Sequence, residues 1–210
     1  MKILIVSDIH GNLAALELVL KAEKDFDQMV SLGDVVNYGP WSNQCVQLLS
    51  TIPNGKLIKG NHEEAFIKGV YQGTNEIAKC FFNHCYPQFE NLTAIEKYIS
   101  EYNCYNYQLT HTLNNEYIYP DSEIQLENNC FIGHSHRMFK KEIGSKNLIN
   151  VGSVGQNRIN ANEINYVVWN PIENDINLKS LIYNSDILIN EMMSLKYPQI
   201  CIDYIRSKQK

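Results

Sequence analysis

The stretch KILIVSDIHGNLAALELVLKAEK, residues 2–24, contains a complete unit of secondary structure. Its apolar run from Ile3 to Val6 predicts a strand, and the polar turn SDIHGN ends that strand. From Leu13 to Lys24 the apolar residues recur at helical spacing, which predicts a helix after the turn. A strand, a loop and a helix in this order are the repeating unit of α/β proteins.

The same order of elements recurs twice further along the chain. The candidate strand QMVSL (28–32) is followed by GDVVNYGP and by helical spacing from Asn43 to Ser50. The candidate strand KLI (56–58) is followed by KGNHEE and by a helical stretch that begins at Glu64. Three such units predict an α/β architecture with a largely buried sheet.

The second half of the chain is predicted to be rich in strands. From about Tyr105 short candidate strands follow one another, and helical signals return between residues 186 and 206. The length of 210 residues, with 44% hydrophobic and 20% charged residues, fits one folded domain. We therefore predict a single domain over residues 1–210 with a core of two sheets flanked by helices. Within it, segment 64–103 is a candidate helical lid or a plain surface helical pair, and segment 185–210 is a C-terminal helical tail.

Charge and cysteine usage limit the classes of partner. Lys and Arg number 18 and Asp and Glu number 23, so the formal charge is −5, and no basic run resembles a phosphate-tracking stripe. We therefore expect no binding of a nucleic-acid polymer, whereas a small phosphorylated substrate fits. The apolar run Ile3 to Val6 is too short for a signal peptide or a membrane span. A cytoplasmic protein without membrane contact is expected, and its six cysteines, which lack CxxC spacing, are predicted to be free thiols.

Chemistry-bearing residues follow the predicted strands at the points where those strands end. The motifs are Asp8-Ile9-His10, Gly33-Asp34, Gly60-Asn61-His62-Glu63, His111 and Gly133-His134-Ser135-His136. Because ligand sites in α/β sheets form outside the carboxyl ends of strands, we expect these motifs to meet at one place. A single histidine after a strand is usually structural. Of the six histidines, however, only His84 lies outside such a motif, and we expect it to be an ordinary surface residue.

The residue types of these motifs predict a metal centre. Asp, His and Asn together suit Mn²⁺, Fe or Zn²⁺, whereas Mg²⁺ and Ca²⁺ prefer shells made of oxygen alone. Several imidazoles and two carboxylates are more ligands than one ion with an open position can use. The sequence therefore predicts two divalent metal ions that share a carboxylate.

The order of the motifs resembles that of the calcineurin-like metallophosphoesterase superfamily, whose blocks DxH, GD, GNH(D/E), a lone H and GHxH all occur here in order. The segments SDIHGNLAAL (7–16), GDVVNYGP (33–40) and NVGSVGQNR (150–158) are most similar to its small bacterial and archaeal phosphodiesterase branch. The resemblance implies a four-layer αββα sandwich with two central mixed β-sheets.

The resemblance also implies a role for each motif residue. Asp8, His10 and His136 would hold the first ion, Asp34 would bridge the two ions, and Asn61, His111 and His134 would complete the second. His62 would protonate the leaving group, and Glu63 would orient His62. Arg158 lies in the segment Gly152 to Arg158, which usually closes the site in relatives, and is a candidate for contact with a substrate phosphate; a plain surface cation is the alternative. Tyr38 lies four residues after Asp34 in a loop that should border the metals, so it is a candidate to stack on a ring of the substrate.

The function implied is that of a metal-dependent phosphoesterase. It would hydrolyse a phosphodiester or a nucleotide-type phosphoanhydride, such as a dinucleoside polyphosphate, through attack by a metal-bridging hydroxide. A phosphomonoesterase or phosphoprotein phosphatase is the alternative, although the GD block lacks the arginine usual in protein phosphatases. A non-catalytic interaction scaffold, as in the retromer subunit, is a further alternative that the presence of His62 disfavours. The short interval from Thr112 to Phe131 predicts an open cleft.

Overall fold

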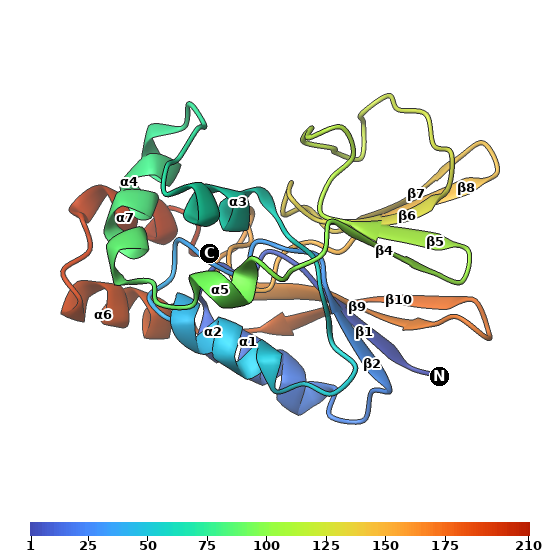
Figure 1. Cartoon of the computed structure of the whole chain (residues 1–210), viewed down its shortest axis with the longest axis horizontal. Coiled ribbons are helices and arrows are strands. Elements are labelled where there is room, and N and C mark those ends of the chain that lie inside the picture. The colour runs from blue at the N-terminus through green and yellow to red at the C-terminus, as the bar shows by residue number, and fades with distance from the viewer.

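The computed structural model describes all residues 1–210 and shows two β-sheets packed against each other, with helices gathered at one side (Figure 1). The first sheet has the strand order β10 (Asp175–Ile182), β9 (Glu163–Asn170), β1 (Ile3–Val6), β2 (Gln28–Ser31) and β3 (Lys56–Leu57). Its strands β1, β2 and β3 are parallel, with Leu4 opposite Met29, while β9 runs antiparallel to β1 and β10. The sheet is therefore mixed.

The second sheet is also mixed and has five strands. Its order is β4 (Glu101–Cys104), β5 (Tyr107–Thr110), β6 (Asn129–Ile132), β8 (Lys146–Asn150) and β7 (Phe139–Ile143). The central strands β5, β6 and β8 are parallel, and the edge strands β4 and β7 are antiparallel to their neighbours. Parallel strands thus occupy the centre of this sheet as well.

Seven α-helices and one short 3₁₀-helix complete the fold. They are α1 (Leu13–Ala22), α2 (Ser42–Ser50), α3 (Asn61–Lys68), α4 (Glu76–Cys85), the 3₁₀-helix η1 (Tyr86–Gln88), α5 (Leu92–Ile95), α6 (Asp186–Ser194) and α7 (Gln199–Arg206). Pro198 occupies the N-cap of α7, where its missing N–H costs no helical hydrogen bond. None of the helices has the length and apolar content needed to cross a bilayer.

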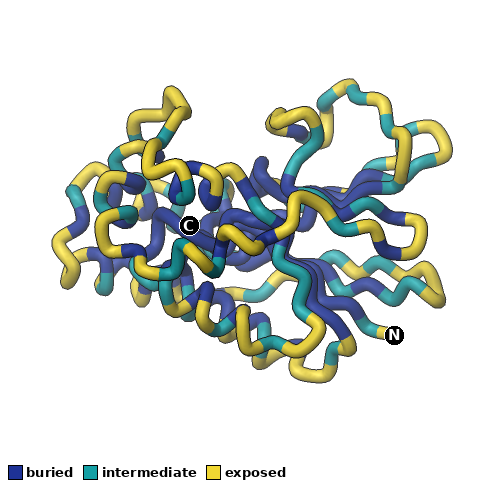
Figure 2. The backbone as a smooth tube through the Cα atoms, in the orientation of Figure 1, coloured by how far each residue is buried: buried dark blue, intermediate teal, exposed yellow.

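Strand β1 is buried on both faces. Leu4 and Val6 point into the largest core cluster, which the helices complete, whereas Ile3 and Ile5 point into the cluster between the two sheets. Successive side chains of a strand alternate between faces, so an unbroken apolar run is needed where both faces are covered. Figure 2 shows the buried backbone, in dark blue, running through the centre of the molecule.

The predicted sandwich of two mixed sheets flanked by helices is confirmed, with one difference at the outer face of the second sheet. That face is covered by the segment between β5 and β6, which contains no helix or strand. Ile118 from this segment is buried in a small cluster with Ile132 and Leu148, and Leu113 packs against the same cluster. The short interval noted in the sequence therefore leaves a loop, and no helix, as the fourth layer.

Some element boundaries differ from those predicted. Helix α3 begins at Asn61, three residues before Glu64, and β7 was not predicted. In segment 64–103 the side chains of Phe66 and Phe81 are fully buried in the main core. The segment therefore contributes to the core, and its movement as a lid stays a prediction.

Candidate metal centre

The motif residues that follow different strands lie together at one end of the two sheets. Asp8 and His10 follow β1, Asp34 follows β2, the GNHE motif follows β3, His111 follows β5 and His134 follows β6. Three groups of their side chains have ligand atoms within 4.8 Å of one another: Asp8 with His10 and His136, His10 with Asp34 and His62, and Asp34 with His111 and His134. The expected meeting of the motifs is thus what the structure shows.

The backbone at this site is unusual for residues with side chains. Asp8, His10, Asp34, His134 and His136 all have φ between 47° and 65°, in the left-handed region. Non-glycine residues rarely adopt this conformation, and its cost is tolerated mainly where function requires a particular side-chain direction. The strained turns aim five candidate ligands toward a common centre.

Glycines allow the loops to approach the carboxylates closely. A Cβ atom added at Gly60 would collide with Asp34 Oδ1, and one added at Gly133 would collide with Ser7 Oγ and lie 2.5 Å from Asp8 Oδ2. The glycine of each motif is therefore required by close contact with a candidate ligand.

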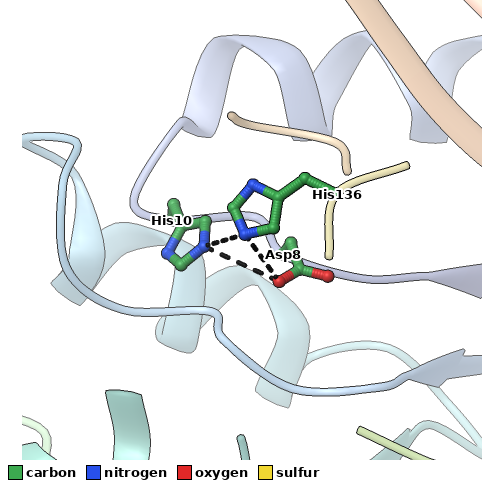
Figure 3. Close-up of side chains that lie close together, drawn as sticks. All are labelled: Asp8, His10 and His136. Carbon is green, nitrogen blue, oxygen red and sulfur yellow. Dashed lines mark hydrogen bonds and ion pairs between the residues drawn. The ribbon is translucent and has the colours of Figure 1, made fainter. Parts of the chain in front are cut away.

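The first group consists of Asp8, His10 and His136 (Figure 3). Nε2 of His136 lies 3.1 Å from Asp8 Oδ1, and Nε2 of His10 lies 3.7 Å from the same oxygen. The two Nε2 atoms lie 3.2 Å apart. All three side chains are buried.

The hydrogen bonds of the two rings show where their protons lie. Nδ1 of His10 lies 3.2 Å from the carbonyl oxygen of Val36, and Nδ1 of His136 lies 2.6 Å from that of Gln156. A carbonyl only accepts, so each Nδ1 carries the proton and each Nε2 presents a lone pair. Two lone pairs that face each other at 3.2 Å repel unless a cation or a proton lies between them.

The second group consists of Asp34, His111 and His134, with Asn61 beside it. Nε2 of His111 lies 3.1 Å from Nδ1 of His134, 3.1 Å from Oδ1 of Asn61 and 3.3 Å from Oδ2 of Asp34. Nδ1 of His111 donates to the carbonyl of Leu32 at 3.0 Å, so Nε2 is the atom that presents a lone pair once the ring has lost its second proton. A polar cleft of about 290 Å³ borders Asn61 and His111 and opens this group to solvent.

Asp34 lies between the two groups. Its Oδ2 atom is 3.3 Å from Nε2 of His111 and 3.9 Å from Nε2 of His10, while its Oδ1 atom accepts the backbone N–H of His62 at 2.9 Å. One carboxylate oxygen is therefore directed at both groups at once.

Burial and neighbouring charges set the protonation states. Burial lowers the pKa of His10 well below its ordinary value and the pKa of His134 to about 4, so both imidazoles are neutral at pH 7. Burial raises the pKa of Asp34, but His111 and His62 outweigh it and hold this pKa well below its ordinary value. Burial lowers the pKa of His111, but Asp34 raises it to about 9 overall.

The donor set fits divalent metal ions. Asp8 Oδ1 is buried and accepts no hydrogen bond, whereas Oδ2 accepts from Ser7 Oγ at 2.6 Å and from the His134 N–H at 3.0 Å. An unpartnered carboxylate oxygen beside converging imidazole lone pairs is costly unless a cation satisfies it. Neutral imidazoles and ionised carboxylates are the ligand forms that such a cation needs.

His62 lies at the edge of the same site, and its partner differs from the one predicted. Nδ1 of His62 lies 2.9 Å from Nδ2 of Asn37, whereas Nε2 lies 4.0 Å from Asp34 Oδ2. With the amide nitrogen as donor, Nδ1 accepts and the ring proton is on Nε2, the atom that faces the candidate ligands. Asn37 was not predicted to be a site residue, although its place three residues after Asp34 puts it in a loop that borders the site.

Glu63 does not orient His62, and the prediction that it does was wrong. Its carboxylate oxygens accept four backbone N–H groups, from Asp34, Val35, Val36 and Gly60, at 2.7–3.1 Å. These bonds occupy the carboxylate, so it has no contact left for the imidazole. Burial and the Asp34 carboxylate raise the pKa of Glu63 to about 7, against the lowering effect of the N–H donors. Glu63 therefore ties the GNHE loop to the GD loop.

The remaining sequence candidates surround the two groups. The ring of Tyr38 lies 4.7 Å from that of His10 and 5.3 Å from that of His62, but only 6% of Tyr38 is exposed. Arg158 is partly buried, so it is not the plain surface cation that was weighed against a site role. His84 is not an ordinary surface residue, because its ring lies 3.9 Å from that of Tyr197.

Several known proteins are similar to this chain. The model of the family described as calcineurin-like phosphoesterase matches residues 1–183. An uncharacterized protein of Methanocaldococcus jannaschii, MJ0912, is 27% identical over 230 residues that span 94% of each chain. A metallophosphoesterase structure from Sphaerobacter thermophilus has a TM-score of 0.81 at 23% identity and 99% coverage of each chain. The structure of a putative diadenosine tetraphosphatase has a TM-score of 0.61 at 18% identity, over 85% of this chain and 93% of its own.

Proposed function

The chain belongs to the calcineurin-like phosphoesterase family and is a metal-dependent phosphoesterase, and on this premise we propose that two divalent ions act in its site on a phosphodiester or a nucleotide-type phosphoanhydride. The observation that carries the proposal is the position of Asp34, whose Oδ2 faces one group of ligands through His10 and the other through His111. A bridging carboxylate is the arrangement found where two ions work as a pair.

The proposed ligands divide between the two ions. Asp8, His10 and His136 would hold one ion, Asn61, His111 and His134 would hold the other, and Asp34 would contribute to both. Mn²⁺, Fe or Zn²⁺ suits this mixture of imidazole, carboxylate and amide oxygen. When bound, such ions polarise the oxygens of a phosphoester and make a nucleophile available from water at neutral pH.

His62 is proposed as the proton donor to the leaving group. Its Nε2 faces the ligand clusters, and the contact of Asn37 with Nδ1 holds the ring in this direction. The proton would be given up by the charged imidazolium, because a neutral ring that loses its proton becomes the strongly basic imidazolate. Glu63 is retained as a supporting residue, because its bonds to the N–H groups of Asp34 and Gly60 fix the loops that carry Asp34 and His62.

The proposed substrate is small, phosphorylated and nucleotide-like. The polar cleft of about 290 Å³ beside Asn61 and His111 has room for a phosphoryl group and its neighbours. Arg158 is proposed to contact a phosphate, and Tyr38 to form the wall beside His10. The fold shared with a putative diadenosine tetraphosphatase supports dinucleoside polyphosphates as the first compounds to assay.

A cytoplasmic location is proposed on the chemistry of the cysteines. All six cysteines are free thiols, and five of them are buried. Free thiols are typical of proteins from a reducing compartment.

The test compares two substrates that share a leaving group. We expect Mn²⁺-loaded protein to hydrolyse bis-p-nitrophenyl phosphate faster than p-nitrophenyl phosphate. For a cyclic nucleotide, whose leaving group is an alkoxide that needs a proton, kcat of the His62→Ala variant should fall about 10²- to 10⁴-fold while metal content is kept, the usual contribution of general acid catalysis. Release of p-nitrophenolate, which leaves without a proton, should fall less. An unchanged kcat in His62→Ala would remove the proposed acid, and a preference for the monoester would assign a phosphomonoesterase.

A further inference from the structure

Arg158 is a partly buried cation without an anionic partner. Its Nε atom is buried and has no hydrogen-bond partner. The basic side chains that form ion pairs with carboxylates, apart from histidines, are Lys2, Lys68 and Lys179, so Arg158 is in none of these pairs. A guanidinium is always protonated, and removing it from water without an anion costs free energy. Such a group is ready to receive an anion from outside the protein.

Tyr117 is the side chain that connects Arg158 to the candidate metal ligands. The Cζ atom of Arg158 lies over the Tyr117 ring, 5.3 Å from its centroid. The same ring stacks on the imidazole of His134, with centroids 4.0 Å apart and planes 22° apart. One phenol ring thus contacts both a proposed metal ligand and the unpaired cation.

The position of Tyr117 is fixed by its neighbour in the chain. Ile118 is only 3% exposed and packs into the small core on the outer face of the second sheet. Tyr117 itself is 50% exposed, so its ring is not placed by burial in a core. The buried isoleucine therefore holds the loop, and the adjacent tyrosine is presented to the site.

The backbone of Arg158 is fixed as well. The Asn157 side chain accepts the N–H groups of Ile159 and Asn160 at 2.9 and 3.2 Å and donates to Asn165 at 2.8 Å. Ahead of it, the N–H of Gly155 donates to the carbonyl of Asp8 at 3.0 Å. The turn that carries Arg158 is therefore tied to the turn that carries Asp8.

Two further phenols lie near the guanidinium. Tyr38 and Tyr204 lie close enough to Arg158 to interact with its charge, and their rings are 6.5 Å apart. Phenol rings attract a cation through their faces and accept hydrogen bonds, but they carry no charge at neutral pH. They can orient the guanidinium and still leave its charge available.

We propose that Tyr117 is a positioning residue that holds Arg158 as an anion-binding arm for a phosphate group of the substrate. This inference rests on the proposed function and deepens it by naming a residue that determines substrate binding. The group that Arg158 would bind is a phosphate, because two phosphate oxygens can accept two parallel N–H groups of a guanidinium. The phosphate is either the one that is cleaved or the one next to it.

The first experiment measures binding of inorganic phosphate to the metal-loaded protein by calorimetry, which requires no turnover. Arg158→Ala should weaken binding about tenfold or more, because a charge-assisted hydrogen bond is lost. Tyr117→Leu should weaken it about threefold to tenfold, and Tyr117→Phe, which keeps the ring, should restore it to within about twofold. The double variant should bind no more weakly than Arg158→Ala alone, because Tyr117 acts through Arg158.

Matched controls separate this role from a structural one. Arg206→Ala and Tyr105→Leu remove an exposed arginine and an exposed tyrosine, and both should bind phosphate as the wild type does. The metal content of every variant is measured as well. Loss of metal in Tyr117→Leu would show that the residue acts through His134 and would overturn the proposal. Additive effects of the two substitutions, or unchanged binding in Arg158→Ala, would overturn it too.

The second experiment identifies the phosphate that is bound. KM is measured for bis-p-nitrophenyl phosphate, which has one phosphate, and for a dinucleoside tetraphosphate. An increase of KM for both substrates in Arg158→Ala assigns the arm to the cleaved phosphate, and an increase for the tetraphosphate alone assigns it to a neighbouring one. An unchanged KM for both substrates would contradict the proposed role of Arg158. Hydrolysis of neither by the wild type would contradict the proposed function, while the phosphate titration would still decide the inference.

Discussion

The side-chain amide of Asn37 lies 2.9 Å from Nδ1 of His62, and both residues are buried. This contact determines which nitrogen of His62 carries the proton, because an amide N–H at Nδ1 leaves the proton on Nε2. A carboxylate at position 37 would have accepted a proton from Nδ1 and favoured the charged imidazolium. The amide instead adds no charge beside the ring and holds Nε2 toward the proposed site of reaction.

Substitution of Asn37 by glycine tests this relationship. Glycine removes the amide and suits the backbone, since Asn37 has φ of 72°. We expect kcat to fall about tenfold because the imidazole is no longer held in position, with metal content unchanged. In the His62→Ala background the same substitution should have no further effect. Wild-type kcat in Asn37→Gly would show that the contact has no role in turnover.

Substitution of Glu63 tests its role as the tie between two loops. Glu63→Gln replaces an acceptor of four N–H groups by a side chain with one acceptor and an N–H₂ group that faces donors. We expect the free energy of unfolding to fall by about 2–3 kcal/mol, as for other buried charge-assisted hydrogen bonds. The adjacent Glu64 is exposed and pairs only with Lys68, so Glu64→Gln should change stability by less than about 0.5 kcal/mol. Equal effects in urea unfolding would contradict this role.

Glu23 predicts a pH dependence of stability that is separate from the metal site. Burial raises its pKa, but bonds from Lys179, Lys2 and Tyr166 outweigh burial and hold the pKa below the ordinary value of 4.5. A carboxylate whose folded pKa is depressed stabilises the fold above its unfolded pKa, and this stability is lost as the pH falls through the folded pKa.

Urea unfolding of Glu23→Gln at several pH values checks this expectation, with a chelator in every sample. The variant should be less stable than the wild type by about 1 kcal/mol at pH 7 and at pH 5. The difference should shrink at pH 4 and below, where the wild-type carboxylate becomes protonated. Glu17→Gln changes an exposed residue of helix α1, the helix that Glu23 follows, and serves as the control. A difference that stays constant down to pH 3 would contradict the ion-pair account.

The fold and the meeting of the motif residues could be predicted from the sequence because both depend on local patterns. Apolar runs such as Ile3–Val6 identify strands, and residues that follow strand ends gather at one edge of a sheet, as Asp8 and His134 do. The prediction needed no knowledge of the loop paths between strands.

The supporting contacts could not be predicted, because they depend on those loop paths. Asn37 reaches His62 through a left-handed turn that no apolar periodicity signals. Glu63 caps the Gly60 N–H, as its place three residues later allows, but its bonds to the backbone of the GD loop have no signal in the sequence. Tyr117 lies in a segment without regular structure, so only the packing of Ile118 places it against His134.

The most direct test of the two-ion site is a titration of metal-free protein with Mn²⁺ while hydrolysis of bis-p-nitrophenyl phosphate is followed. Because Asp34 faces both ligand groups, we predict that the rate rises until two ions are bound per chain and then stays constant. Asp34→Ala should show no such rise at the same Mn²⁺ concentrations. Saturation of the rate at one ion per chain, or full hydrolysis by the metal-free protein, would contradict the account.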